Sequence, residues 1–397
     1  MNKLRTLLEE DGPRNATGRI VRVLSEYGAL SATQISRISG LAKSTVSTAL
    51  VELRRSGMVV ESHALESSKS AGVGRPAKLL TLNPQAGTCV GILVGFDHIQ
   101  VIVADVSHAL LFDESVQVSL DYTPEYAAEL VGDLVAKAYA IPGFCKDTLL
   151  GVGIAVAGPI DPTSGRVLRG GGVPTWAGID IRTIFEPALD RPIFADNESN
   201  CAAIAEMTWG AAVGHRDFVL YTVDLGIGGA IVSRGHVMTG AAGAAAEFGH
   251  ISIDPNGPLC RCGNRGCLEL YASFREPLAL AQKRFGPISV EEVALRAQQG
   301  DVGCRRLIED TAELAGRGLG VITASVNPSL IVIAGRLVHS GDLLIDALSR
   351  SYDRHALVKS SDVGEDARTR IVPSRFIDNA ACMGAVGLVL RHHARLA

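Results

Sequence analysis

The chain has 397 residues, 47% of them hydrophobic, and a formal net charge of −4 at pH 7. This length suits two or three compact domains, and the hydrophobic fraction excludes a largely disordered protein. No apolar run could span a bilayer and the first residues do not form an export signal, so we expect a cytoplasmic protein with no membrane contact. Under these conditions the eight cysteines favour thiols or metal ligands over disulfides.

The N-terminal residues predict a winged helix-turn-helix in residues 1–85. Apolar residues recur at helical spacing in residues 16–27, and Ser31 is a typical N-cap for a short second helix. A third helix is expected over residues 44–56, and the apolar pairs around residues 59–60 and 79–82 suit the two strands of a hairpin. This module carries 12 Lys and Arg against 7 Asp and Glu, a net of +5, which favours a polyanionic partner.

The third helix has the composition of a recognition helix that enters the major groove of DNA. Short polar side chains and single cations suit contacts with base edges and phosphates. We therefore expect a double-stranded DNA operator as partner, and Arg75 on the hairpin could enter a minor groove. The alternative is a winged helix used only for protein contacts. The candidate DNA-binding residues are Lys43, Ser44, Thr45, Ser47, Thr48, Arg54 and Arg75.

Residues 86–397 alternate apolar strands with helices, which predicts an α/β architecture of two lobes with a cleft between them. The first lobe is expected over about 86–195 together with the C-terminal helix, and the second over about 196–379. Predicted strands of the first lobe are 90–94, 101–104, 116–120 and 149–156, with a helix over 125–140. Predicted strands of the second lobe are 218–223, 230–232 and 331–334.

The segment "EFGHISIDPNGPLCRCGNRGCLE" predicts a metal site. One imidazole and three thiols form a complete tetrahedral set for Zn²⁺ and leave no position for a reactive water, so the zinc would be structural. Glycines and a proline let the loop fold tightly around the ion. The alternative is a loop of free cysteines. The predicted zinc ligands are His250, Cys260, Cys262 and Cys267.

Several runs resemble motifs of the ROK family, which groups bacterial repressors and sugar kinases: "GIAVAGPIDPTSGRV", "ADNESNCAAIAE", "AAEFGHISID", "CRCGNRGCLE" and "NPSLIVIAG". The resemblance implies an actin-like, RNase H-like sugar-kinase-type domain and a homodimer or homotetramer. The helix-turn-helix makes the chain similar to the family's regulators of the xylose or glucose type. By position, a sugar or sugar-phosphate pocket would use Asn197, Glu198, Glu247, His250 and Glu269. Asn197 could instead simply cap a helix.

The chain departs from the kinase pattern of the family at several places. Leu93 stands where the kinases carry an Asp, and Asp224 introduces a negative charge into the run that resembles a phosphate loop. Glu198 replaces the Asp that serves as general base, and Arg336 stands in a loop where the family has a second glycine. These departures predict a chain that has lost catalysis.

Three hypotheses remain open. The leading one is a regulator of carbohydrate metabolism, expected to be a repressor with an activator as the alternative, that responds to a ligand in a degenerate kinase-like cleft. The second is an active ATP-dependent sugar kinase with an added DNA-binding domain, against which Leu93 and Asp224 speak. The third is a regulator whose pocket is vestigial and which a protein partner controls.

Overall fold

The computed structural model describes residues 3–9, 15–61, 78–141, 144, 146–161, 163–168, 174–189 and 191–395. Two compact units divide the chain. The first consists of Met1–Val156, Ile179–Asp196 and Ala385–Ala397, and the second of Ala157–Gly178 and Asn197–Gly384. The helix-turn-helix module therefore belongs to the same unit as the first sheet of the α/β region. None of the helices in the described part of the chain is long and apolar enough to cross a membrane.

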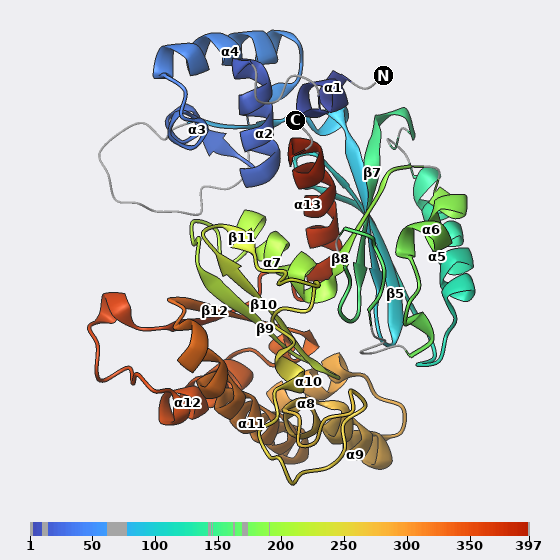
Figure 1. Ribbon diagram of the computed structural model, residues 1–397, viewed down its shortest axis with the longest axis vertical. Coiled ribbons are helices and arrows are strands. Elements are labelled where there is room, and N and C mark those ends of the chain that lie inside the picture. The colour runs from blue at the N-terminus through green and yellow to red at the C-terminus, as the bar shows by residue number, and fades with distance from the viewer. Residues whose placement is uncertain are drawn as a thin grey trace. The chain divides into compact units, whose positions relative to one another are not determined.

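The predicted winged helix-turn-helix is present (Figure 1). Ser31 begins α3 through a capping box: its hydroxyl accepts from the Gln34 N–H, and the Gln34 side chain accepts from the Ser31 N–H. Helices α2 and α4 pack on each other through residues such as Ile20, Leu24 and Leu50, all buried. The module comprises α1 (Lys3–Glu9), α2 (Ala16–Tyr27), β1 (Leu30–Ser31), α3 (Ala32–Ser39), α4 (Lys43–Arg55), β2 (Val59–Glu61) and β3 (Leu79–Leu82), with the strands in the order β1-β3-β2.

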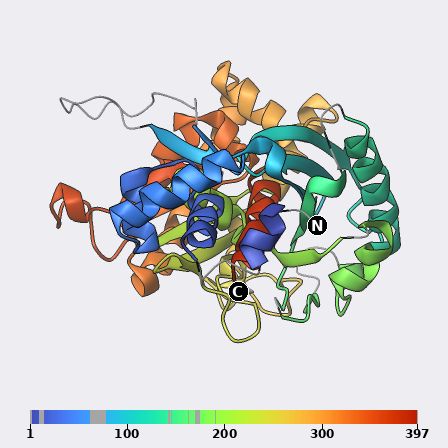
Figure 2. The same ribbon diagram turned by 90° about the horizontal axis from the view of Figure 1, so that it is seen from above.

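The first unit also holds a five-stranded sheet in the order β6-β5-β4-β7-β8. Strands β4, β5 and β7 are almost continuously apolar, because helices α5 and α6 lie side by side on one face and the end of α13 covers the other (Figures 1 and 2). Its elements are β4 (Thr88–Val94), β5 (His98–Asp105), β6 (Leu110–Gln117), α5 (Pro124–Tyr139), β7 (Leu149–Val156), α6 (Ile181–Leu189) and β8 (Ile193–Asn197). The C-terminal helix α13 (Ala380–Arg395) has residues in both units.

One predicted strand of this sheet is displaced. We expected a strand over residues 116–120, whereas β6 runs from Leu110 to Gln117 and pairs antiparallel with β5. The reason is exposure: β6 is an edge strand whose residues alternate between exposed and half-buried, so it lacks the apolar run that marks the inner strands.

The second unit is built on a five-stranded sheet in the order β11-β10-β9-β12-β13. Val219, Tyr221 and Val223 of β9 face helices α10, α11 and α12, while Phe218 and Leu220 face α7 on the opposite side, as the period of a strand requires. The elements are α7 (Glu198–Trp209), β9 (Phe218–Val223), β10 (Ile227–Ser233), β11 (His236–Val237), α8 (Glu269–Ala272), α9 (Arg275–Phe285), α10 (Val290–Gln298), α11 (Val302–Val326), β12 (Leu330–Ala334), α12 (Asp342–His355) and β13 (Arg370–Pro373).

Two glycines of β10 lie where neighbouring groups come close to the backbone. Gly228 and Gly229 are both within the strand and pair with Thr222 and Tyr221 of β9. A Cβ atom on Gly229 would lie 2.4 Å from the Phe248 ring, and one on Gly228 would lie 2.8 Å from the Ser199 hydroxyl. Close approach of neighbouring groups, rather than turn geometry, therefore requires glycine at these two positions.

Candidate functional site

Helix α4 presents its polar residues to solvent. Val46, Leu50 and Leu53 form its buried side, and its N-cap, Ala42, has an extended conformation. Arg54 and Arg55 in the last turn suit the negative end of the helix dipole. All the predicted DNA-binding residues in the described part of this module are exposed, namely Lys43, Ser44, Thr45, Ser47, Thr48 and Arg54. The remaining one, Arg75, lies outside the described residues.

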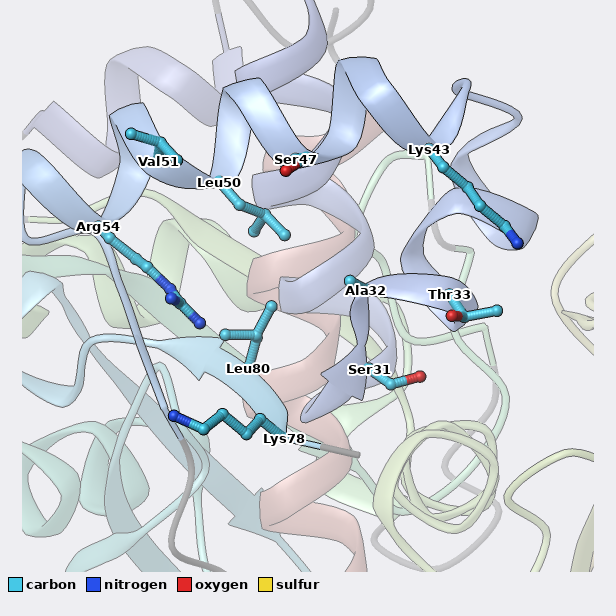
Figure 3. Close-up of a pocket in the computed structure, with 10 residues that line it drawn as sticks. All are labelled: Ser31, Ala32, Thr33, Lys43, Ser47, Leu50, Val51, Arg54, Lys78 and Leu80. Atoms are coloured by element: carbon cyan, nitrogen blue, oxygen red, sulfur yellow. The ribbon is translucent and has the colours of Figure 1, made fainter. Parts of the chain in front are cut away.

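A pocket of about 420 Å³ lies beside α4 in this module (Figure 3). Leu50 and Leu80 provide its apolar part, and the first residues of α3 and the beginning of β3 complete the wall. Two of its cations are held by one acid: a Glu61 carboxylate oxygen lies 3.1 Å from the Arg54 guanidinium and the other lies 2.8 Å from the Lys78 ammonium. The sequence interpretation placed Lys78 on the hairpin but did not single out Glu61 as its partner, because only the pairing of β2 with β3 brings the two together. The lining residues are Ser31, Ala32, Thr33, Lys43, Ser47, Leu50, Val51, Arg54, Lys78 and Leu80.

The four predicted metal ligands converge in the second unit. One ligand atom from each lies within 4.8 Å of every other, and this group could hold a metal ion. The Cys260 sulfur is 3.6 Å from His250 Nδ1, and the Cys262 sulfur is 3.6 Å from that of Cys267. Zinc–sulfur bonds of about 2.3 Å would place tetrahedral ligands about 3.8 Å apart, so the separations and the donor chemistry both suit such an ion.

Local backbone geometry explains how the cysteines converge. The Cys260 N–H donates to Asn264 O at 2.7 Å, which closes the turn that carries Cys260 and Cys262. Gly266, at φ 59°, passes so close to the backbone of Asp254 that a Cβ atom would lie 1.7 Å from its carbonyl oxygen. Glycine is therefore required at this position for the loop to bring Cys267 back to His250.

Two of the predicted ligand-binding carboxylates lie beside this cluster. Glu269 begins α8, and its two oxygens accept from the Arg261 guanidinium at 2.8 Å and from the Ile227 N–H at 3.2 Å. Burial, and next the charge of Glu269, raise the pKa of Glu247 to about 7, while the charge of Arg261 opposes the shift. Arg261 is a residue that the sequence interpretation missed, although its place between Cys260 and Cys262 ties it to the loop.

The other two predicted ligand-binding residues lie at the start of α7. Asn197 is the N-cap of this helix: its Oδ1 accepts from the Ser199 and Asn200 N–H groups, and its Nδ2 donates to Gly158 O at 2.9 Å. Asn197 therefore caps α7, and its contact with a ligand stays a prediction. Glu198 is the first residue of α7 and is half-buried. The Ser199 hydroxyl lies against Gly228, next to the Ile227 N–H that binds Glu269.

Two of the residues that we expected to depart from the kinase pattern contact each other. Asp224 directly follows β9 and Arg336 lies just after β12, and a double hydrogen bond joins their side chains. Arg336 Nη2 is 2.7 Å from Asp224 Oδ1, and the Arg336 backbone N–H is 2.7 Å from Oδ2. Leu93 is a buried residue of β4 in the first unit, where it pairs with Gln100 and Ala155.

Two family models match different parts of the chain. The model of the ROK family matches residues 89–392, and that of the IclR helix-turn-helix domain matches residues 17–63. A xylose repressor of Bacillus spizizenii is 28% identical over 373 residues, which are 94% of either chain.

Solved structures resemble both the whole chain and its larger part. A ROK-family transcriptional regulator, described as a homologue of the E. coli MLC protein, has a TM-score of 0.67 at 22% identity and covers 99% of this chain and 95% of its own. A ROK-family glucokinase from Streptomyces griseus in complex with glucose and AMPPNP also has a TM-score of 0.67, at 27% identity, and covers 76% of this chain and 99% of its own.

Proposed function

Since the chain belongs to the ROK family and carries an N-terminal helix-turn-helix, we propose that it is a sugar-responsive transcriptional repressor. The observation that carries the proposal is the joining of an exposed, polar recognition helix to a sugar-kinase-type domain in one chain. The ligand would change the affinity of the repressor for its operator, and a coupling of about 1–3 kcal/mol between the two sites is enough for such a response.

The DNA-binding residues are proposed to be those exposed on α4, together with Arg75. Ser44, Thr45, Ser47 and Thr48 would meet base edges in the major groove, while Lys43 and Arg54 would contact phosphates. A homodimer or homotetramer would set two such helices about one turn of DNA apart, as an operator with two half-sites requires. Because its target would be an operator in chromosomal DNA, we expect the protein in the cytoplasm.

The cluster of His250 and the three cysteines is proposed to hold Zn²⁺. His250 would coordinate through Nδ1, which faces Cys260, and its Nε2 would then be directed away from the ion. Bound zinc would supply no reaction here, since four protein ligands close its coordination sphere. The loop, ordered by the ion, would in turn hold Arg261 and Glu269 in place, where their side chains form an ion pair.

A sugar is proposed to bind beside this loop. Glu247, Glu269 and His250 offer the donors and acceptors that pair with sugar hydroxyls, and Arg261 already orients Glu269. Asn197 and Glu198 would contribute from the start of α7. Xylose is a natural first candidate because the Bacillus relative is a xylose repressor, and glucose is a second because the glucokinase structure holds it.

Loss of kinase activity is part of the proposal. In phosphoryl transfer, cations neutralise the charge of the nucleotide. Here Asp224 places a negative charge in the run that resembles a phosphate loop. The neighbouring cation, Arg336, is already bound to Asp224 through its side chain and its backbone N–H. Leu93 provides no ligand for Mg²⁺. Glu198, one methylene longer than the Asp it replaces, would be misaligned as a general base.

The proposal is tested by selecting operator fragments from a pool of random duplexes with the purified protein, then measuring their release by fluorescence anisotropy. D-xylose, D-glucose and their phosphates are added one at a time, and ATP hydrolysis is followed in parallel. We expect one sugar to lower operator affinity about tenfold or more, with no ATP turnover above background. Sugar phosphorylation at an enzymatic rate would contradict the loss of catalysis, and no binding to any duplex would contradict the regulator.

A further inference from the structure

Glu61 lies where an acid is unexpected in a DNA-binding module. It is the last residue of β2, and the antiparallel pairing of β2 with β3 sets it opposite Leu80. From there its carboxylate bridges Arg54, at the end of α4, and Lys78, just before β3. One acid therefore occupies two of the three cations that line the pocket beside α4.

The chemistry of this pocket fits the backbone of a nucleic acid strand. Arg54 and Lys78 lie close together at one side and Lys43 lies at the other, and the Ser31, Thr33 and Ser47 hydroxyls complete the polar lining (Figure 3). Cations and hydroxyls are the groups that proteins most often use to bind phosphate oxygens, whereas the apolar residues Leu50 and Leu80 tolerate the sugar carbons.

We propose that this pocket receives the phosphates of one DNA strand, and that Glu61 competes with them for Arg54 and Lys78. The inference rests on the proposed DNA-binding function and adds a residue that limits it. Because backbone phosphates are the same in every sequence, competition by Glu61 lowers the affinity for operator and non-operator DNA alike.

The exposure of the ion pairs makes such competition feasible. The side chains of Arg54, Lys78 and Glu61 are 45%, 62% and 37% exposed. Pairs as accessible as these contribute little to stability and exchange readily, so a phosphate can displace the carboxylate. While Glu61 is bound, however, the three side chains together carry one positive charge rather than two, and the local attraction for DNA is correspondingly weaker.

The test uses Glu61→Gln in the full-length protein and a fluorescent duplex of mixed sequence that contains no selected operator. We expect the variant to bind this probe about fivefold more tightly, the order of one exposed ion pair. The slope of log affinity against log salt concentration should also become steeper by about one, because one more phosphate contact releases counterions.

Glu186→Gln is the matched control: it removes an equal charge from an exposed position on α6 of the same unit. Arg54→Gln and Lys78→Gln should each weaken binding and flatten the slope of log affinity against log salt concentration. When Glu61→Gln is added to the Arg54→Gln, Lys78→Gln double variant, the affinity should rise no more than it does in the control. The inference alone is overturned if the wild type binds and Glu61→Gln gains no more than Glu186→Gln. If neither protein binds any duplex, the proposed function fails as well.

Discussion

Asp224 and Arg336, 112 residues apart in the chain, bind each other through both side chains and one backbone N–H. The pair joins the end of β9 to the residue that follows Gly335, whose φ of 103° brings its backbone close to Val223 O. The sequence predicted both residues as departures from the kinase pattern, and in the structure the acid and the base are each held by the other. Such a pair stabilises the local arrangement of β9 and β12.

This ion pair should be important for stability. Asp224→Ala leaves the Arg336 guanidinium, which is only 17% exposed, without its main partner. We expect the free energy of unfolding to fall by about 2 kcal/mol, measured by urea denaturation with circular dichroism. The double variant with Arg336→Ala should lose less than the sum of the two single variants, since both report on one interaction.

The exposed pair of Arg305 and Glu309 on α11 provides the comparison for this prediction. Glu309→Gln removes a surface ion pair at i,i+4 spacing and should cost about 0.5 kcal/mol or less. Equal losses in Asp224→Ala and Glu309→Gln would mean that Asp224 and Arg336 contribute no more than an ordinary surface pair.

The cysteine cluster should bind zinc and brace the second unit. The purified protein is expected to contain about one zinc ion per chain by mass spectrometry of the metal, and Cys262→Ser should contain much less. The same variant should melt at a lower temperature and become insensitive to a chelator, because the metal contributes directly to folding of the loop. Cys304→Ala changes a buried thiol of α11 outside the cluster and should keep its zinc. Full zinc occupancy in Cys262→Ser would exclude this ligand set.

Glu247 should be required for the response to sugar and dispensable for DNA binding. Its side chain is half-buried beside Glu269, so a sugar hydroxyl that it accepts from would be partly shielded from water. Glu247→Gln is expected to weaken the sugar response about tenfold or more while leaving operator affinity in the absence of sugar unchanged, as followed by anisotropy. Glu276→Gln, at an exposed position on α9, is the control. A normal response in the Glu247 variant would show that the ligand binds elsewhere.

Glu206 should be among the most sensitive positions of the second unit. It is fully buried, and its Oε1 accepts from the Ser374 hydroxyl at 2.5 Å and from the Arg375 N–H at 3.0 Å, while Oε2 accepts from the Ala211 N–H at 2.6 Å. Glu206→Ala would leave these donors buried without an acceptor, and we expect a loss of about 3 kcal/mol in the free energy of unfolding.

A second variant of Glu206 separates the effect of losing the hydrogen-bond acceptors from the effect of losing side-chain volume. Glu206→Gln keeps the volume but places an amide NH₂ group among N–H donors, so it should recover only part of the stability in the same urea titration. Full stability in either variant would contradict the role of Glu206 as the acceptor that fastens residues 374–376 to α7.

The sequence by itself determined the elements whose signals are local. Helix α2 begins and ends where apolar spacing predicted, Ser31 caps α3, and strands β7 and β9 have the predicted bounds, since a buried strand must be apolar throughout. The four metal-ligand candidates were also readable, because His250 and the three cysteines lie within 18 consecutive positions and their chemistry is specific.

Only the tertiary structure decided which distant residues meet. The residues near Glu61 in the chain do not predict its contact with Lys78, because the pairing of β2 with β3 creates this contact. In the same way, the pairing of β9 with β12 brings Asp224 to Arg336. Exposure likewise made the bounds of β6 hard to predict, because this edge strand has no buried residue. Local patterns are set by the covalent period of helices and strands, whereas the partner of a charged side chain depends on chain segments that only folding brings together.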